Sequence, residues 1–152
     1  ALGLGMKVIA ADSYIDKVDV KVEFFDGQSV TTTIVSQSLE SLFKEADFIS
    51  LHVPAQNGYI ISKAELAIMK DGVGIVNCAR GGVIDEIALI DALDSGKVGF
   101  AGLDVFESEP KPEIKILMHP KISLTPHIGA ATGEAQDRIG TELAQQIISI
   151  LG

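Results

Sequence analysis

Side chains that can bind anions or move protons follow several apolar stretches of this sequence. Arg80 lies in NCARGG (residues 77–82), His127 lies in TPHIG (residues 125–129), and ESEP (residues 107–110) supplies two glutamates. A guanidinium stays charged and its fixed fork of donors can pair with two oxygens. A histidine titrates near neutrality, which suits general acid–base chemistry. These residue types indicate a site for a small anionic ligand and a proton transfer.

Each of these residues also has an ordinary structural interpretation when it is taken alone. An acid that ends a strand, such as Asp12 or Asp104, commonly serves a turn or a cap. Arg80 could be a solvated loop charge, His127 a structural histidine and Glu109 a surface acid. His52 and His119 share no metal-ligand spacing with His127, so we predict no metal site.

Composition narrows the class of protein. The 152 residues are enough for one ordinary domain, and 47% of them are hydrophobic, as in a globular protein. The net charge of -9 argues against broad electrostatic binding to nucleic acid or to an anionic membrane. The single cysteine, Cys78, excludes an internal disulfide framework and favours a reducing, cytoplasmic location. No apolar run reaches the length of a membrane span.

Strands and helices are predicted to alternate along most of the chain. Apolar DFISLHV (residues 47–53) is typical of a strand buried on both faces of a parallel sheet. Ser62 and Glu65 have the spacing of a capping box, and Thr132 precedes a long amphipathic stretch. This alternation indicates a doubly wound α/β fold with a parallel sheet. The further expected strands are residues 7–11, 72–78, 98–105 and 121–127, and the further helices follow Ser38 and cover residues 85–96.

A β-hairpin is predicted at about residues 18–36. Valines alternate with polar residues on one side of Asp26-Gly27, and Val30, Thr32 and Ile34 alternate on the other. Such alternation around Asp-Gly is a strong hairpin signal. The hairpin would be an insertion between the first strand and the following helix.

The opening ALGLG resembles a dinucleotide fingerprint but does not complete one. G-x-G-x-x-G needs a third glycine at position 8, which is Val8, and it needs a strand before it. Gly3 and Gly5 instead indicate a helix that ends before a strand.

The chemical segments together resemble the D-2-hydroxyacid dehydrogenase family, with a leaning towards its phosphoglycerate dehydrogenases. The similarity rests on GMKVIAAD, ADFISLHVP, the run from VNCARGG to VFESEP, and ISLTPHIGAATGEAQDRIG. These segments cover most of the chain outside the hairpin, and the order NxARGG, LDVFExEP, TPHIG is highly specific. The resemblance implies a Rossmann-like fold, NAD as cofactor, and a small 2-hydroxy or 2-keto acid as substrate.

The resemblance also implies a role for individual residues. Arg80 would grip the substrate's carboxylate and keto oxygen, His127 would be the general acid/base, and Glu109, not Glu107, would pair with it. A carboxylate against an imidazole favours its protonated form. Asp12 would accept hydrogen bonds from the adenosine ribose and disfavour a 2′-phosphate. The other implied cofactor contacts are His52, Val53, Pro54, Cys78, Ala79, Arg80, Asp104, His127 and Gly129.

The resemblance further implies what the chain contains. It would be a partial NAD-binding domain over residues 1–152, without the first strand, the start of the fingerprint helix or a substrate-binding domain. The absent strand would separate the strand at Lys7 from the strand around residue 75, and the isolated fragment would bind NAD poorly and be inactive. The loop after Pro54 is shorter than usual, and Gln56 replaces a common threonine.

The activity implied for the parent protein is oxidation of 3-phosphoglycerate to 3-phosphohydroxypyruvate, in serine biosynthesis, by a homo-oligomer (a dimer or tetramer). Glyoxylate, hydroxypyruvate and D-lactate dehydrogenases stay open. So does a non-catalytic NAD-sensing module of the corepressor type.

Overall fold

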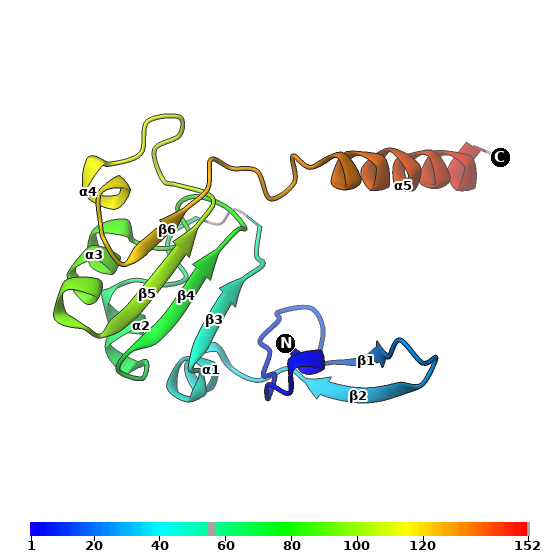
Figure 1. The fold of residues 1–152 in the computed structure, drawn as a ribbon, viewed down its shortest axis with the longest axis horizontal. Coiled ribbons are helices and arrows are strands. Elements are labelled where there is room, and N and C mark those ends of the chain that lie inside the picture. The colour runs from blue at the N-terminus through cyan, green and yellow to red at the C-terminus, as the bar shows by residue number, and fades with distance from the viewer. Residues whose placement is uncertain (55–56, 152) are drawn as a thin grey trace.

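The computed structural model describes residues 1–54 and 57–151 as two sheets with flanking helices (Figure 1). A short 3-10 helix, η1 (Leu2–Leu4), comes first, and Gly5 ends it in the left-handed conformation (φ 76°), as predicted. The remaining elements follow in chain order: β1 (Lys17–Glu23), β2 (Ser29–Val35), α1 (Leu39–Glu45), β3 (Phe48–Leu51), α2 (Lys63–Ile68), β4 (Val73–Asn77), α3 (Glu86–Ser95), β5 (Val98–Leu103), α4 (Ile114–Leu117), β6 (Ile122–Leu124) and α5 (Gly133–Leu151).

The larger sheet is parallel and has the order β3-β4-β5-β6. Ile49 pairs with Ile75, Ile75 with Ala101, and Ala101 with Ile122, so the strands are aligned at their centres. The strand around residue 75 was expected to lie beside a gap, and that prediction is wrong. β4 is paired on both sides, with β3 and with β5, and among the described strands β3 lies at that side of the sheet.

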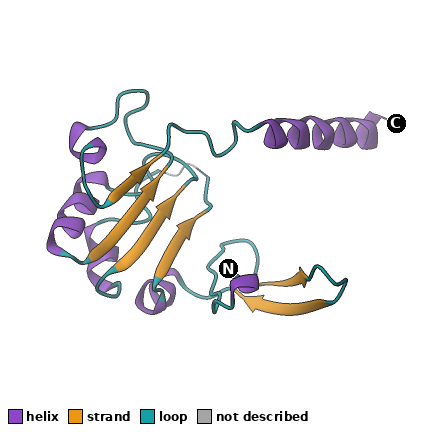
Figure 2. Cartoon of the chain, viewed as in Figure 1, coloured by secondary structure: helices purple, strands orange, loops and turns teal. Residues whose placement is uncertain are grey.

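Helices α1 to α4 cover one face of this sheet (Figure 2). The core between them contains the apolar side chains Phe43 of α1, Leu66 of α2 and Leu89 of α3, packed with Ile75 and Ala101 of the sheet. β3 alternates exposed and buried residues, and Phe48 on its outer face is 63% exposed. The prediction that this strand is buried on both faces is therefore wrong for the described residues, since the helices cover one face.

Local capping explains where the helices begin. Ser38 accepts a hydrogen bond from the Ser41 N–H at the start of α1. At α2, Ser62 and Glu65 form the predicted capping box, with the Ser62 N–H donating to Glu65. Thr132 accepts from the Ala135 N–H at the start of α5, as its position before the amphipathic stretch predicted. These caps pair N–H groups that the first helical turn leaves without a partner.

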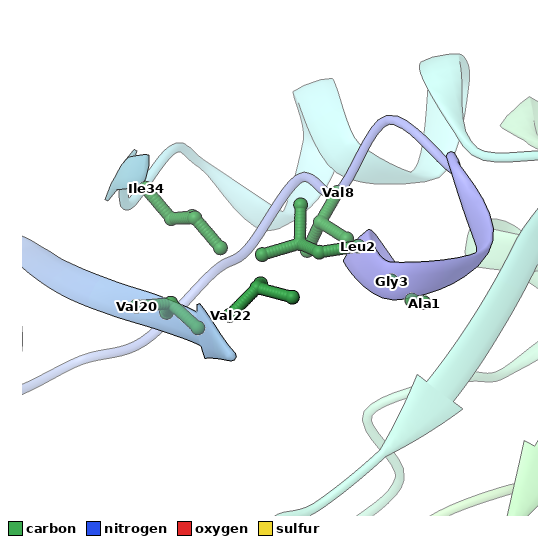
Figure 3. A pocket seen from close by; sticks show the side chains of 7 residues that line it. All are labelled: Ala1, Leu2, Gly3, Val8, Val20, Val22 and Ile34. Carbon is green, nitrogen blue, oxygen red and sulfur yellow. The ribbon is translucent and has the colours of Figure 1, made fainter. Parts of the chain in front are cut away.

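The predicted hairpin is present as an antiparallel pair, with Val18 opposite Ile34 and Glu23 opposite Ser29. Gly27 takes the left-handed conformation that its turn needs (φ 84°). The apolar face of the hairpin lies against η1 and the segment after it, around a groove of about 380 Å³. Figure 3 shows Leu2 and Val8 facing Val20, Val22 and Ile34 across this groove.

The strand expected at residues 7–11 does not form. This segment makes one isolated parallel bridge, between Ala10 and Ser36, at the base of the hairpin. A strand requires a neighbour along its whole length, and the described residues supply one at that single position.

Candidate active site

The predicted site residues gather where the parallel strands end. His52, Val53 and Pro54 follow β3, residues 77–82 follow β4, Asp104 follows β5, and residues 125–129 follow β6. Because the four strands are parallel and adjacent, these loops lie together at the carboxyl end of the sheet (Figure 1). Ligands bind outside the carboxyl ends of the strands in open α/β sheets.

His127 and Glu109 are in direct contact. The His127 Nδ1 lies 2.7 Å from Glu109 Oε2, and the Phe106 N–H donates to Glu109 Oε1 at 3.0 Å. The hydrogen bond from His127, followed by that from Phe106, lowers the pKa of the Glu109 carboxyl. An ionised carboxylate only accepts hydrogen bonds, so Nδ1 carries the proton and Nε2 is left for another partner. The expected pairing of His127 with Glu109 rather than Glu107 is present.

Asp104 positions the loop that carries His127. It is 3% exposed, and it accepts hydrogen bonds from the Thr125 hydroxyl, the Ile128 N–H (2.9 Å) and the Gly129 N–H (2.8 Å). Burial by itself would raise the pKa of Asp104, but these hydrogen bonds together outweigh it and lower the pKa. The bonds on both sides of His127 hold that residue in the left-handed backbone conformation (φ 55°), which is uncommon for residues other than glycine.

Arg80 stands on a neighbouring loop that is ordered by Asn77 at the end of β4. The Asn77 side chain accepts from the Ala79 N–H and donates to the Arg80 carbonyl. The Arg80 guanidinium donates to the Ala79 carbonyl at 2.6 Å and is exposed, so it is free to turn towards an anion. Asn77 belongs to the NCARGG motif, but no role was predicted for it; the available signal was an Asn at the end of a strand.

The Arg80 loop touches the loop after β5 very closely. A Cβ atom at Gly81 would lie 1.8 Å from the carbonyl oxygen of Phe106, so only glycine fits there. Glu86 and Glu107 link the same two loops through hydrogen bonds to each other's backbone N–H. Sequence reasoning missed this link because the two residues are far apart in the chain and have no motif spacing.

The predicted cofactor residues lie at the carboxyl end of the sheet or close to the base of the hairpin. Asp12 Oδ1 accepts from the Tyr14 and Ile15 N–H groups, which leaves its second oxygen available in an exposed position. This fits an acceptor for ribose hydroxyls. His52 contacts the Ser50 hydroxyl at 2.8 Å, and Cys78 is an exposed free thiol. Val53 and Ala79 pack partly against the core, Pro54 is exposed, and Gln56 lies outside the described residues.

A cavity of about 430 Å³ lies beside the Glu109–His127 pair. Its wall is mostly apolar and contains Phe106, Pro110 and Leu124. In the described part of the chain, three or more potential metal-binding side chains gather nowhere. His52 and His119 are used elsewhere, by Ser50 and by Asp94.

None of the helices described here combines the length and apolar character needed to cross a membrane. The longest described helix is α5, and Figure 1 shows it extending away from the sheet. Its sequence contains both polar and apolar residues, and among its described residues only Ala135 is buried.

Comparison with known proteins identifies the family. Residues 1–129 match the family described as D-isomer specific 2-hydroxyacid dehydrogenase, NAD binding domain. A hydroxypyruvate reductase from Thermotoga maritima is 49% identical over 100% of this chain and 47% of its own length. A D-3-phosphoglycerate dehydrogenase from Methanocaldococcus jannaschii is 43% identical over 99% of this chain and 28% of its own length. The chain thus spans about half or less of these relatives.

Solved structures agree with this assignment. The structure of a D-lactate dehydrogenase from Aquifex aeolicus, complexed with NAD and lactic acid, has a TM-score of 0.72 and 34% identity over 99% of this chain and 47% of its own. The predicted Rossmann-like α/β class and the predicted cofactor, NAD, are confirmed. This chain belongs to the family of NAD-binding domains of D-isomer specific 2-hydroxyacid dehydrogenases.

Proposed function

We propose that the protein carrying this chain is an oxidoreductase that transfers a hydride between NAD and a D-2-hydroxy acid. The observation that carries the proposal is the contact of 2.7 Å between His127 Nδ1 and Glu109 Oε2. It fixes one ring nitrogen and leaves Nε2 for a substrate proton, which is what a general acid/base requires. Membership of the family supports the same reading.

The proposed mechanism assigns one task to each residue. His127 Nε2 takes the proton of the C2 hydroxyl when the hydroxy acid is oxidised, and returns it to the C2 oxygen in the reverse direction. Glu109 stabilises the resulting imidazolium through Nδ1. Arg80 pairs with the substrate's carboxylate and its C2 oxygen, which a bidentate guanidinium suits. NAD, when bound, supplies the hydride acceptor.

In this proposal, residues at the carboxyl end of the sheet and near the base of the hairpin hold the cofactor. Asp12 accepts from the ribose hydroxyls with its free oxygen, and Gly129 and Asp104 lie near the nicotinamide carboxamide. His52, Val53 and Pro54, with Cys78 and Ala79, line the cleft. A side chain at Gly129 would crowd Asp104, because a Cβ there would lie 2.9 Å from Asp104 Oδ2.

The substrate proposed from the sequence is 3-phosphoglycerate, which would place the protein in serine biosynthesis. Two of the relatives described above favour different substrates, since one is a hydroxypyruvate reductase and the other a D-3-phosphoglycerate dehydrogenase. Hydroxypyruvate is therefore the second candidate, favoured by the higher identity of 49%. A cytoplasmic location, a homo-oligomeric assembly and the partial-domain organisation over residues 1–152 stay predictions.

The test compares the complete protein with three variants. Turnover is measured with NAD and D-3-phosphoglycerate, and with NADH and hydroxypyruvate, glyoxylate or pyruvate; the highest kcat/KM identifies the substrate. His127→Asn should lower kcat by about 10²- to 10⁴-fold with NAD affinity retained, and Glu109→Gln should lower it less. Asn is chosen because it tolerates the left-handed conformation. His119→Asn, at a histidine outside the site, is the matched control.

The outcomes separate the hypotheses. Wild-type turnover with loss in His127→Asn, but not in His119→Asn, supports the mechanism. Turnover that survives in His127→Asn refutes the role of His127. NAD binding with no turnover of any of these acids would instead favour a non-catalytic binding module.

A further inference from the structure

Glu86 and Glu107 form an unusual reciprocal contact between two carboxylate residues. The Glu86 N–H donates to Glu107 Oε1 at 3.0 Å, and the Glu107 N–H donates to Glu86 Oε1 at 2.8 Å. The second Glu107 oxygen accepts from the Tyr59 hydroxyl at 3.3 Å. Two hydrogen bonds from backbone N–H groups to the Glu86 and Glu107 carboxylates therefore link two backbone segments that are 21 residues apart.

This contact is held without a neutralising cation. Glu86 is 7% exposed, and no lysine or arginine of the described residues forms an ion pair with either glutamate. Burial, followed by the nearby charges of Glu107 and Glu113, raises the pKa of Glu86 against the opposing effect of the Glu107 N–H. Burying a carboxylate near a second carboxylate costs desolvation and repulsion free energy, and a single hydrogen bond from an N–H offsets only part of it.

The joined segments carry the two halves of the candidate site. On one side, Glu86 opens α3 at the end of the loop that bears Arg80 and Gly81. On the other side, Glu107 follows Phe106, whose carbonyl oxygen lies against Gly81. The Phe106 N–H in turn donates to Glu109, which holds His127. The reciprocal contact lies beside the point where these two halves meet.

We propose that Glu86 and Glu107 are positioning residues that set the spacing between Arg80 and the Glu109–His127 pair. The proposal rests on the function proposed above, because it assigns a purpose to that spacing. Neither glutamate needs to touch substrate or cofactor. Each acts through the backbone of the other's loop, so that the guanidinium and the imidazole address the same small anion.

A purely structural role would be helix capping. Asp85 already accepts from the Ala88 N–H at the start of α3, and Glu107 adds a second acceptor there. If capping were the whole role, loss of the contact would lower stability and leave kcat unchanged. Glu65 offers the comparison, since it also accepts from a backbone N–H, that of Ser62, in the capping box of α2.

The experiment uses the complete protein with four variants: Glu86→Ala, Glu86→Gln, Glu107→Ala and Glu65→Ala. Glutamine retains one side-chain oxygen, the amide oxygen, that can accept from the Glu107 N–H, so Glu86→Gln is the rescue variant. Thermal unfolding, kcat and KM for the hydroxy or keto acid, KM for NAD, and the NMR signal of the His127 Nδ1 proton are measured. If Glu86→Ala does not fold, Glu107→Ala removes the other half of the reciprocal contact, the bond from the Glu86 N–H to Glu107 Oε1, at an exposed residue.

We expect Glu86→Ala and Glu107→Ala to lower kcat by about 10- to 100-fold with a small change in KM for NAD, since misplacement of about 1 Å has effects of this size. Glu86→Gln should keep kcat within about threefold of wild type, and Glu65→Ala should lose stability but not kcat. Equal kcat in wild type and both alanine variants would overturn the proposal, as would an equal loss of kcat in Glu65→Ala.

A failure of the proposed function gives a different pattern. If the wild type turns over none of the acids, the function proposed above is refuted and the His127 signal decides the positioning role. A Nδ1 proton signal that shifts or broadens in the alanine variants, but not in Glu86→Gln or Glu65→Ala, supports positioning. An unchanged signal in all variants overturns it.

Discussion

At Gly81 the loop of Arg80 lies very close to the loop that leads to Glu109. A Cβ atom placed on it would lie 1.8 Å from the Phe106 carbonyl oxygen and 2.5 Å from the Phe106 carbonyl carbon. Real Cβ contacts almost never fall below 3.0 Å, so Gly81→Ala must move the two loops apart by about 1.2 Å, the difference between 3.0 Å and 1.8 Å. The opposing atoms are backbone and cannot rotate aside.

This displacement acts directly on the site, because the Phe106 N–H is bonded to Glu109. A shift of about 1 Å in the relative position of catalytic groups lowers rates by about 100-fold. We therefore expect Gly81→Ala to lower kcat by about 100-fold and the free energy of unfolding by about 1–3 kcal/mol, the usual range for overpacking.

The assay is steady-state turnover of the complete protein with its best substrate, together with urea unfolding. Gly133→Ala is the matched control, since a Cβ there meets nothing within 4 Å and its φ is not positive. It should leave both quantities close to wild type. Wild-type kcat in a folded Gly81→Ala protein would refute the idea that the two loops must touch for turnover.

Three further predictions concern stability. Asp104→Asn should lower the free energy of unfolding by about 1–3 kcal/mol at neutral pH. The native carboxyl has a lowered pKa, so its contribution to stability disappears as the pH falls through that pKa, below 3.8. Urea unfolding of wild type and variant at neutral pH and at a pH below 3.8 checks this. For Glu86 the pKa is raised, so the unfolded chain releases this proton first as the pH rises above 4.5, and Glu86→Gln should gain stability over wild type in that direction; equal pH profiles would contradict this. Gly27→Ala should destabilise the hairpin by about 1–2 kcal/mol, because of its left-handed conformation, and speed amide exchange in β1 and β2 but not in β4.

The sequence predicted those features that short-range chemistry determines. The Ser62–Glu65 spacing located the start of α2, and Asp26-Gly27 located the hairpin turn. In the site, the contact between Glu109 and His127 followed from the motifs that carry the family resemblance. The first two signals span a few residues each, and the third joins two recognisable motifs.

Features that depend on partners far along the chain were not predictable. Residues 7–11 have the composition of a strand, but a strand also needs a neighbour, and here the bridge from Ala10 to Ser36 is the one described. The edge position of β3 is likewise a property of the whole sheet. The Glu86–Glu107 contact and the bracing of the His127 loop by Asp104 join separate loops, so no local spacing could indicate them.

The hairpin has a practical consequence for studying this protein. It packs against the first residues of the chain and joins the rest at the Ala10–Ser36 bridge, while its tip at Phe25 is fully exposed. Exposed loop tips tolerate insertion well. A short peptide tag or a fluorescent label inserted at this tip would therefore follow tumbling and assembly in solution while leaving the strand ends that carry Arg80, Glu109 and His127 undisturbed.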